Sequence, residues 1–174
     1  MALQKDFLWG GALAAHQFEG GVLNTSKGYS VADVMTAGAH GVPREITDGV
    51  VEGKYYPNHV GIDFYHRYKE DIALMAEMGF KTYRFSISWS RIIPEGTGAV
   101  NPKGIEYYNN VINECLKYGI EPLVTMFHFD MPAALDERGS WGNRDGKAYP
   151  LEPKGLLCYD KREGLSAEKE GSIW

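Results

Sequence analysis

Three strand-like segments alternate with helix-like segments along this chain, and this order restricts the possible folds more than any other feature. The strand-like segments cover residues 7–15, 80–88 and 121–129. Strands that are separated by helix-length connections pair in parallel, and the connections between them are right-handed. The sequence therefore predicts an α/β protein whose parallel sheet is built from βα units.

Two of the helices are predicted from the spacing of their apolar residues. The first follows Gly61 and ends at Gly79, a residue type that often ends a helix. Its apolar face consists of residues three or four positions apart, namely Phe64, Tyr68, Ile72, Met75 and Met78. The second helix has Pro102 in its first turn and ends at Gly119. A short third helix is expected to open at Pro132.

The apolar stretch 7–15 fits two explanations. A secretion signal would combine a basic start, an apolar run and small residues at a cleavage site. Asp6 lies in the supposed basic region and two of the nine residues are Gly, so a buried strand is the better interpretation. The segment from Gly20 to Asn58 has little periodicity and many glycines, which predicts a long loop.

Polar and aromatic side chains follow each predicted strand, at the edge where parallel sheets bind their ligands. They are His16, Gln17 and Glu19 after the first strand, Ser88, Trp89 and Arg91 after the second, and His128, Phe129 and Asp130 after the third. No GxGxxG phosphate-binding pattern follows any strand, which weakens a nucleotide-binding interpretation. The second and third strands begin at residues 80 and 121, a spacing that fits either a (β/α) barrel or a doubly wound sheet. The missing phosphate-binding pattern favours the barrel.

Composition and charge argue against several classes of function. The net charge is −5 and no basic block stands out, so neither a nucleic-acid partner nor a membrane partner is expected. Cys115 and Cys158 lie far apart without further ligand patterns, so we expect no metal site and a reduced, cytoplasmic setting. Aromatic residues make up 13% of the chain, which fits either an aromatic-rich core or a sugar-binding surface.

Four stretches in the same order carry a family resemblance: FLWGGALAAHQFEGG, GIDFYHRYKEDIALMAEMGFKTYRFSISWSRIIPEG, NPKGIEYYNNVINECLKYGIEPLVTMFHFDMP and WGNR. Over about residues 5–144 the chain resembles glycoside hydrolase family 1. This resemblance implies the N-terminal portion of a (β/α)8 TIM barrel, with about three βα units and therefore incomplete. It also implies β-glycoside cleavage with retention of configuration. We expect a partial glycosidase domain over 1–144 and a divergent tail over 145–174.

The third strand end refines this resemblance. His128-Phe129-Asp130-Met131-Pro132 stands where many β-glucosidases of the family have His-Trp-Asp-Leu-Pro. The Phe and Met version resembles the bacterial cytoplasmic 6-phospho-β-glucosidases, which implies a phosphorylated β-glucoside as substrate and no cofactor. A plain β-glucosidase and a 6-phospho-β-galactosidase remain the alternatives.

The resemblance also assigns roles to four side chains. Gln17 and His128 would form hydrogen bonds with hydroxyl groups of the sugar, and Phe129 would line the same pocket. Arg84 would lie beside the nucleophilic carboxylate, where a fixed cation keeps that group ionised. Glu19 would be structural rather than a catalytic acid.

Two family motifs do not occur in these 174 residues. They are the Asn-Glu-Pro tripeptide of the acid/base and the Glu-Asn-Gly tripeptide of the nucleophile. Retaining glycosidases need both carboxyl groups. We therefore expect a truncated, frameshifted or internally deleted product that is marginally stable or prone to aggregation, and inactive alone. The alternatives are a non-catalytic sugar-binding module and assembly with a complementing chain.

Overall fold

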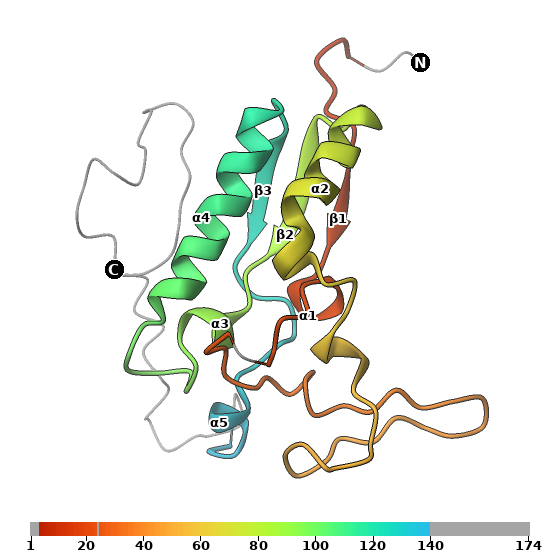
Figure 1. The fold of residues 1–174 in the computed structure, drawn as a ribbon, viewed down its shortest axis with the longest axis vertical. Coiled ribbons are helices and arrows are strands. Elements are labelled where there is room, and N and C mark those ends of the chain that lie inside the picture. Colours follow the sequence, from red (N-terminus) through yellow and green to blue (C-terminus); the bar gives the residue numbers. More distant parts are fainter. Residues whose placement is uncertain (1–3, 24, 140–174) are drawn as a thin grey trace. The chain divides into compact units, whose positions relative to one another are not determined.

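A computed structural model describes residues 4–23 and 25–139, all of which belong to a compact unit, Met1–Ser140. Its centre is a parallel sheet with the strand order β1-β2-β3 (Figure 1). The strands are β1 (Gly10–Leu13), β2 (Thr82–Ser86) and β3 (Glu121–Thr125). The predicted parallel α/β fold is confirmed. The tail predicted over 145–174 lies outside the described residues.

Two long helices follow the predicted pattern. Helix α2 covers Phe64–Glu77 and helix α4 covers Pro102–Lys117. Helix α4 begins where Asn101 caps it, since the Asn101 side chain accepts a hydrogen bond from the backbone N–H of Lys103. Helix α2 ends before Gly79, whose φ of 86° lies in the left-handed region that glycine tolerates best.

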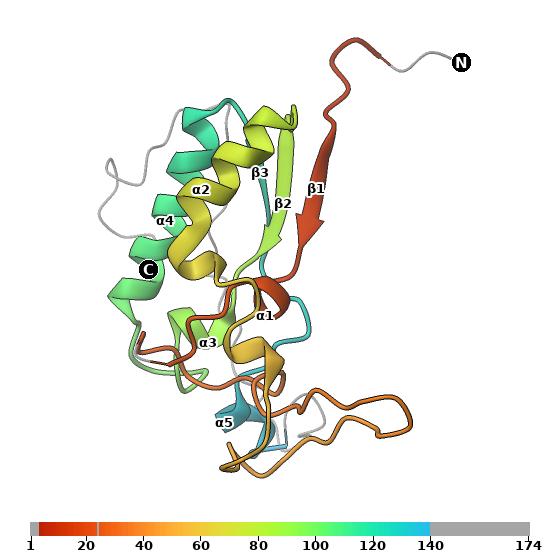
Figure 2. The same cartoon turned by 45° about the vertical axis from the view of Figure 1, so that its right-hand side comes forward.

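Both helices pack on the same face of the sheet, and the core lies between them and the strands (Figures 1 and 2). Tyr83 and Phe85 of β2 point into this core because alternate residues of a strand face the same side. The two helices contribute six buried side chains to this core: Phe64 and Ile72 from α2, and Tyr107, Tyr108, Val111 and Cys115 from α4. Burial also raises the pKa of the Cys115 thiol to about 12.

The opposite face of the sheet carries the other set of side chains. Ala12, Arg84 and Leu123 are partners in the strand register, so they form a row across this face. No helix of the described residues covers the row, and Leu123 is 59% exposed. In a closed barrel, this is the face that points inward.

The strand ends differ from the prediction. Strand β1 stops at Leu13, and the chain turns into the short helix α1 (Ala15–Phe18), so His16 and Gln17 lie on a helical turn. The Ser86 hydroxyl accepts a hydrogen bond from the Ala15 backbone N–H at 2.7 Å, which ends the ladder and starts the turn. A second unpredicted helix, α3 (Trp89–Ile92), follows β2.

The predicted long loop is confirmed, since the described residues between Glu19 and the 3-10 helix η1 (Pro57–His59) form no helix and no strand of the sheet. A bridge between Ser30 and Pro132 ties this loop to the segment after β3. The short helix expected at Pro132 is present as α5 (Ala133–Asp136). Helices α1, α3 and α5 and the loop all lie beyond the carboxyl ends of the strands (Figure 1).

Candidate functional site

Hydrogen bonds between neighbouring strands bring the three strand ends together. Ser86 of β2 binds the Ala15 backbone N–H just after β1. Arg84 of β2 donates from Nε to the Thr125 hydroxyl at the end of β3, at 2.7 Å. The segments that follow the three strands therefore start from one edge of the sheet, as the parallel order predicted.

His128 lies beside α1, the helical turn that carries Gln17. The rings of His128 and His16 are 6.0 Å apart between centroids, and the backbone of Gln17 follows His16 directly. Burial lowers the pKa of His16, and the nearby His128 acts in the same direction. His16 Nδ1 is buried and has no hydrogen-bond partner among the described residues. The sequence placed His16 at this strand end but assigned it no role.

Gln17 and Phe129 are open to solvent. The Gln17 side chain is exposed and forms no hydrogen bond with the described residues. Phe129 is 79% exposed, and its ring centroid lies 5.3 Å from that of His128. The backbone of Phe129 has a φ of 63°, which is uncommon for a residue with a bulky side chain and often marks functional segments.

Arg84 lies on the helix-free face of the sheet and is half-buried. Its bond to Thr125 uses Nε alone. The two terminal nitrogens of the guanidinium make no hydrogen bond or ion pair with the described residues. Arg84 is therefore able to hold a carboxylate on this face.

A buried ion pair between Glu19 and Arg91 fixes the C-terminal end of α1. Glu19 accepts hydrogen bonds from Arg91 Nε at 2.9 Å and from the Tyr108 hydroxyl at 2.8 Å. Arg91 also donates to the Gly20 carbonyl oxygen at 2.8 Å, and its guanidinium carbon lies 4.4 Å from the centroid of the Tyr65 ring. These contacts fit the structural role expected for Glu19. The sequence did not identify Arg91 as its partner.

Asp130 is a second buried carboxyl group at the strand ends, which the sequence placed there without assigning it a role. Its side chain is 0% exposed. Neither of its oxygens has a hydrogen-bond partner of ordinary geometry among the described residues. Burial raises the pKa of Asp130 to about 7, and the nearby Ser88 hydroxyl lowers it less strongly.

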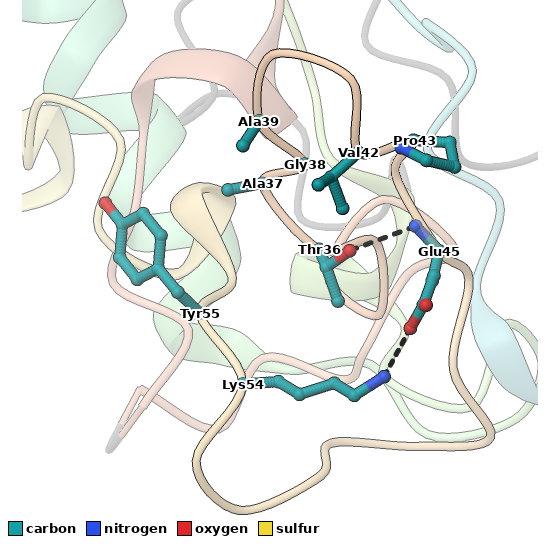
Figure 3. A pocket seen from close by; sticks show the side chains of 9 residues that line it. All are labelled: Thr36, Ala37, Gly38, Ala39, Val42, Pro43, Glu45, Lys54 and Tyr55. Atoms are coloured by element: carbon teal, nitrogen blue, oxygen red, sulfur yellow. Dashed lines mark hydrogen bonds and ion pairs between the residues drawn. The ribbon is translucent and has the colours of Figure 1, made fainter.

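A separate shallow pocket lies within the long loop (Figure 3). Most of the residues that line it have small or apolar side chains, and Lys54 and Glu45 form an ion pair on one side. The lining residues are Thr36, Ala37, Gly38, Ala39, Val42, Pro43, Glu45, Lys54 and Tyr55. None of the four site residues predicted from the sequence lines it. The described residues contain neither a group of three metal-ligating side chains nor a helix long and apolar enough to cross a membrane.

Comparisons with known proteins agree on one family. The model of glycosyl hydrolase family 1 matches residues 1–148. The chain is 62% identical over 144 residues to the aryl-phospho-beta-D-glucosidase BglA of Bacillus subtilis, covering 82% of this chain and 30% of that protein. It is 51% identical to the 6-phospho-beta-glucosidase AscB of Escherichia coli, covering 92% of this chain and 35% of that protein.

A solved structure supports the same assignment. The family 1 β-glucosidase of Thermotoga maritima superposes with a TM-score of 0.68 and 43% sequence identity, over 82% of this chain and 30% of that chain. The chain thus spans about a third of the length of these relatives. The three-stranded parallel sheet is a part of the family's TIM barrel. With a family match that covers most of its length, this chain belongs to glycosyl hydrolase family 1.

Proposed function

We propose that this chain provides the sugar-binding side of a 6-phospho-β-glucosidase site. The observation that carries the proposal is the contact between His128 and α1, because it brings His128 and Gln17 to one edge of the sheet. The names of the relatives from Bacillus subtilis and Escherichia coli support the phosphorylated substrate. The cytoplasmic location expected from the sequence belongs to the same proposal.

The chemistry of these side chains suits a pyranose ring. Each sugar hydroxyl both donates and accepts hydrogen bonds, and so do the amide of Gln17 and the neutral imidazole of His128. The exposed ring of Phe129 offers an apolar surface to the C–H face of the sugar. Together they recognise a glucoside by polar contacts at its edge and an aromatic contact at its face.

Arg84 has a different role in this proposal. Its free terminal nitrogens would pair with a nucleophilic carboxylate and lower the pKa of that group. A retaining glycosidase uses two carboxyl groups about 5 Å apart, one as nucleophile and one as acid/base. Since neither family tripeptide that carries them occurs here, we propose that the 174 residues bind the glucoside but do not hydrolyse it without a complementing chain.

The proposal is tested by calorimetric titration of the chain with p-nitrophenyl 6-phospho-β-glucoside and with its non-phosphorylated analogue. We expect saturable binding that is lost in Gln17→Ala and His128→Ala. Gln4→Ala is the matched control, because Gln4 is also exposed but lies before β1. Equal affinity for both ligands would favour the plain β-glucosidase type. Unchanged affinity in Gln17→Ala and His128→Ala would contradict the proposed site.

A further inference from the structure

The segments around the strand ends hold five buried charged side chains, and we refer to them as the buried charge cluster. It comprises Glu19, Lys27, Asp33, Arg91 and Asp130. Three of these side chains carry carboxyl groups and two carry cations. The cluster therefore cannot pair every carboxyl group with a cation of its own.

Two of the carboxyl groups are paired with cations. Glu19 binds Arg91 at 2.9 Å and also accepts a hydrogen bond from Tyr108. Asp33 forms an ion pair with Lys27 and accepts two hydrogen bonds from Ser30, at 2.7 Å from its backbone N–H and at 2.8 Å from its hydroxyl. Both cations of the cluster are used in these pairs.

Asp130 is the carboxyl group that is left over. It makes no ion pair with the described residues, and neither of its oxygens has a hydrogen-bond partner of ordinary geometry among them. A buried carboxylate that has no cation of its own, and mainly the nearby Ser88 hydroxyl to favour its ionised form, is much less favourable than the neutral acid. The charged groups that act on Asp130 are Glu19 after α1, which opposes ionisation, and Lys27 of the loop, which favours it. Since Lys27 is already paired with Asp33, it stabilises the ionised form of Asp130 less.

The backbone around Asp130 carries two of the predicted sugar contacts. Asp130 follows Phe129, whose φ of 63° is unfavourable for this residue type and has to be held by its surroundings. Two backbone hydrogen bonds hold the residues that follow Asp130. The Val31 N–H donates to the Met131 carbonyl oxygen at 2.8 Å, and the Ala133 N–H donates to the Tyr29 carbonyl oxygen at 2.9 Å. The Asp130 side chain, which is fully buried, directly follows Phe129.

We propose that Asp130 is a positioning residue whose neutral acid form keeps His128 and Phe129 in the binding arrangement. Ionisation draws the carboxylate toward water and releases the segment that carries these two residues. The effect of Asp130 on sugar affinity rests on the proposed function. Its effect on the position of His128 and Phe129 is independent of that function.

The first test needs no substitution and no ligand. The side-chain carboxyl carbon of Asp130 is followed by NMR in the 13C-labelled chain between pH 4 and pH 9. We expect a midpoint near pH 7, accompanied by shifts of the Phe129 and Met131 amide resonances with the same midpoint. A midpoint near pH 4, or a carboxyl titration that leaves these amides unmoved, overturns the proposal.

The second test measures affinity for p-nitrophenyl 6-phospho-β-glucoside across the same pH range. With a midpoint near pH 7, affinity of the unaltered chain should fall about tenfold between pH 6 and pH 8, in proportion to the competent fraction. Asp130→Asn has the shape of the neutral acid and should lack this fall. Asp136→Asn is the matched control because Asp136 is exposed on α5, and it should behave like the unaltered chain.

The possible results are distinct. If Asp130→Asn follows the same pH profile as the unaltered chain, Asp130 does not position the site. If the glucoside binds to none of the variants at any pH, the proposed function fails, and the carboxyl and amide titrations still decide whether Asp130 controls its segment.

Discussion

Arg91 Nε lies 2.9 Å from Glu19 Oε2, and both side chains are about 1% exposed. The pair joins the segment after β1 to the helix after β2, so it holds two of the three strand ends in a fixed relation. Truncating one partner leaves the other charge buried without compensation, which costs about 3–5 kcal/mol.

Arg91→Ala is therefore expected to lower the free energy of unfolding by about that amount, measured by urea denaturation. The control is Arg67→Ala. Arg67 lies on the exposed surface of α2, and its ion pairs with Glu70 and Asp71 are long, at 3.9 and 3.8 Å. Exposed pairs contribute about 0–1 kcal/mol. Equal effects of the two substitutions would contradict the buried role of Arg91.

Two buried tyrosines differ in how their hydroxyl groups are satisfied. The Tyr83 hydroxyl is buried and has no partner among the described residues. Since an unpaired buried hydroxyl is costly, Tyr83→Phe should leave stability unchanged or raise it by about 1 kcal/mol. Tyr108→Phe is the matched comparison. Its hydroxyl donates to Glu19 and accepts from the Ser88 backbone N–H, so this change should cost about 1–3 kcal/mol. The order of the two midpoints in thermal unfolding checks the prediction.

Gly10 allows β1 to lie close to β2. A Cβ atom at Gly10 would clash with the carbonyl oxygen of Thr82, its register partner. Gly10→Ala should destabilise the chain by about 2 kcal/mol or more, because backbone cannot move aside as a side chain can. Gly11→Ala is the control in the same strand, where the nearest atom is the edge of the Phe80 ring at 2.8 Å. A larger loss in Gly11→Ala, measured by thermal unfolding, would contradict this reading of the strand contact.

The periodic parts of the chain were predictable from the sequence. The α2 and α4 helices each present an apolar face over several turns, and glycine or proline marks their ends. The parallel order of the strands follows from these helical connections. The same reasoning placed Gln17 and His128 at one edge of the sheet, where α1 and the segment after β3 indeed meet.

Short elements and buried pairs were not predictable in the same way. Helices α1 and α3 have four residues each, too few for a periodic pattern to stand out. Arg91 and Glu19 are 72 positions apart, so only the fold reveals that they pair. The position of Asp130 after a strand was visible in the sequence. Its lack of an ion-pair partner was not, because it depends on the pairing of Arg91 with Glu19 and of Lys27 with Asp33.

The elevated pKa of Asp130 predicts how the stability of the chain depends on pH. Its pKa rises from an ordinary value of 3.8 to about 7 in the folded protein because the side chain is buried. Between these values the folded state binds more protons at this position than the unfolded state does. The free energy of unfolding therefore falls as pH rises through this range, by a total on the order of 4 kcal/mol.

Urea denaturation at pH 4.5, 6 and 8 measures this dependence. Asp130→Asn cannot ionise, so its stability should decline less than that of the unaltered chain between pH 4.5 and pH 8. The difference between the two chains should be largest at pH 8, where Asp130 is ionised and the asparagine is not. Asp136→Asn should keep the full decline, since Asp136 is exposed. Parallel curves for the unaltered chain and Asp130→Asn would show that Asp130 ionises in the folded state without cost.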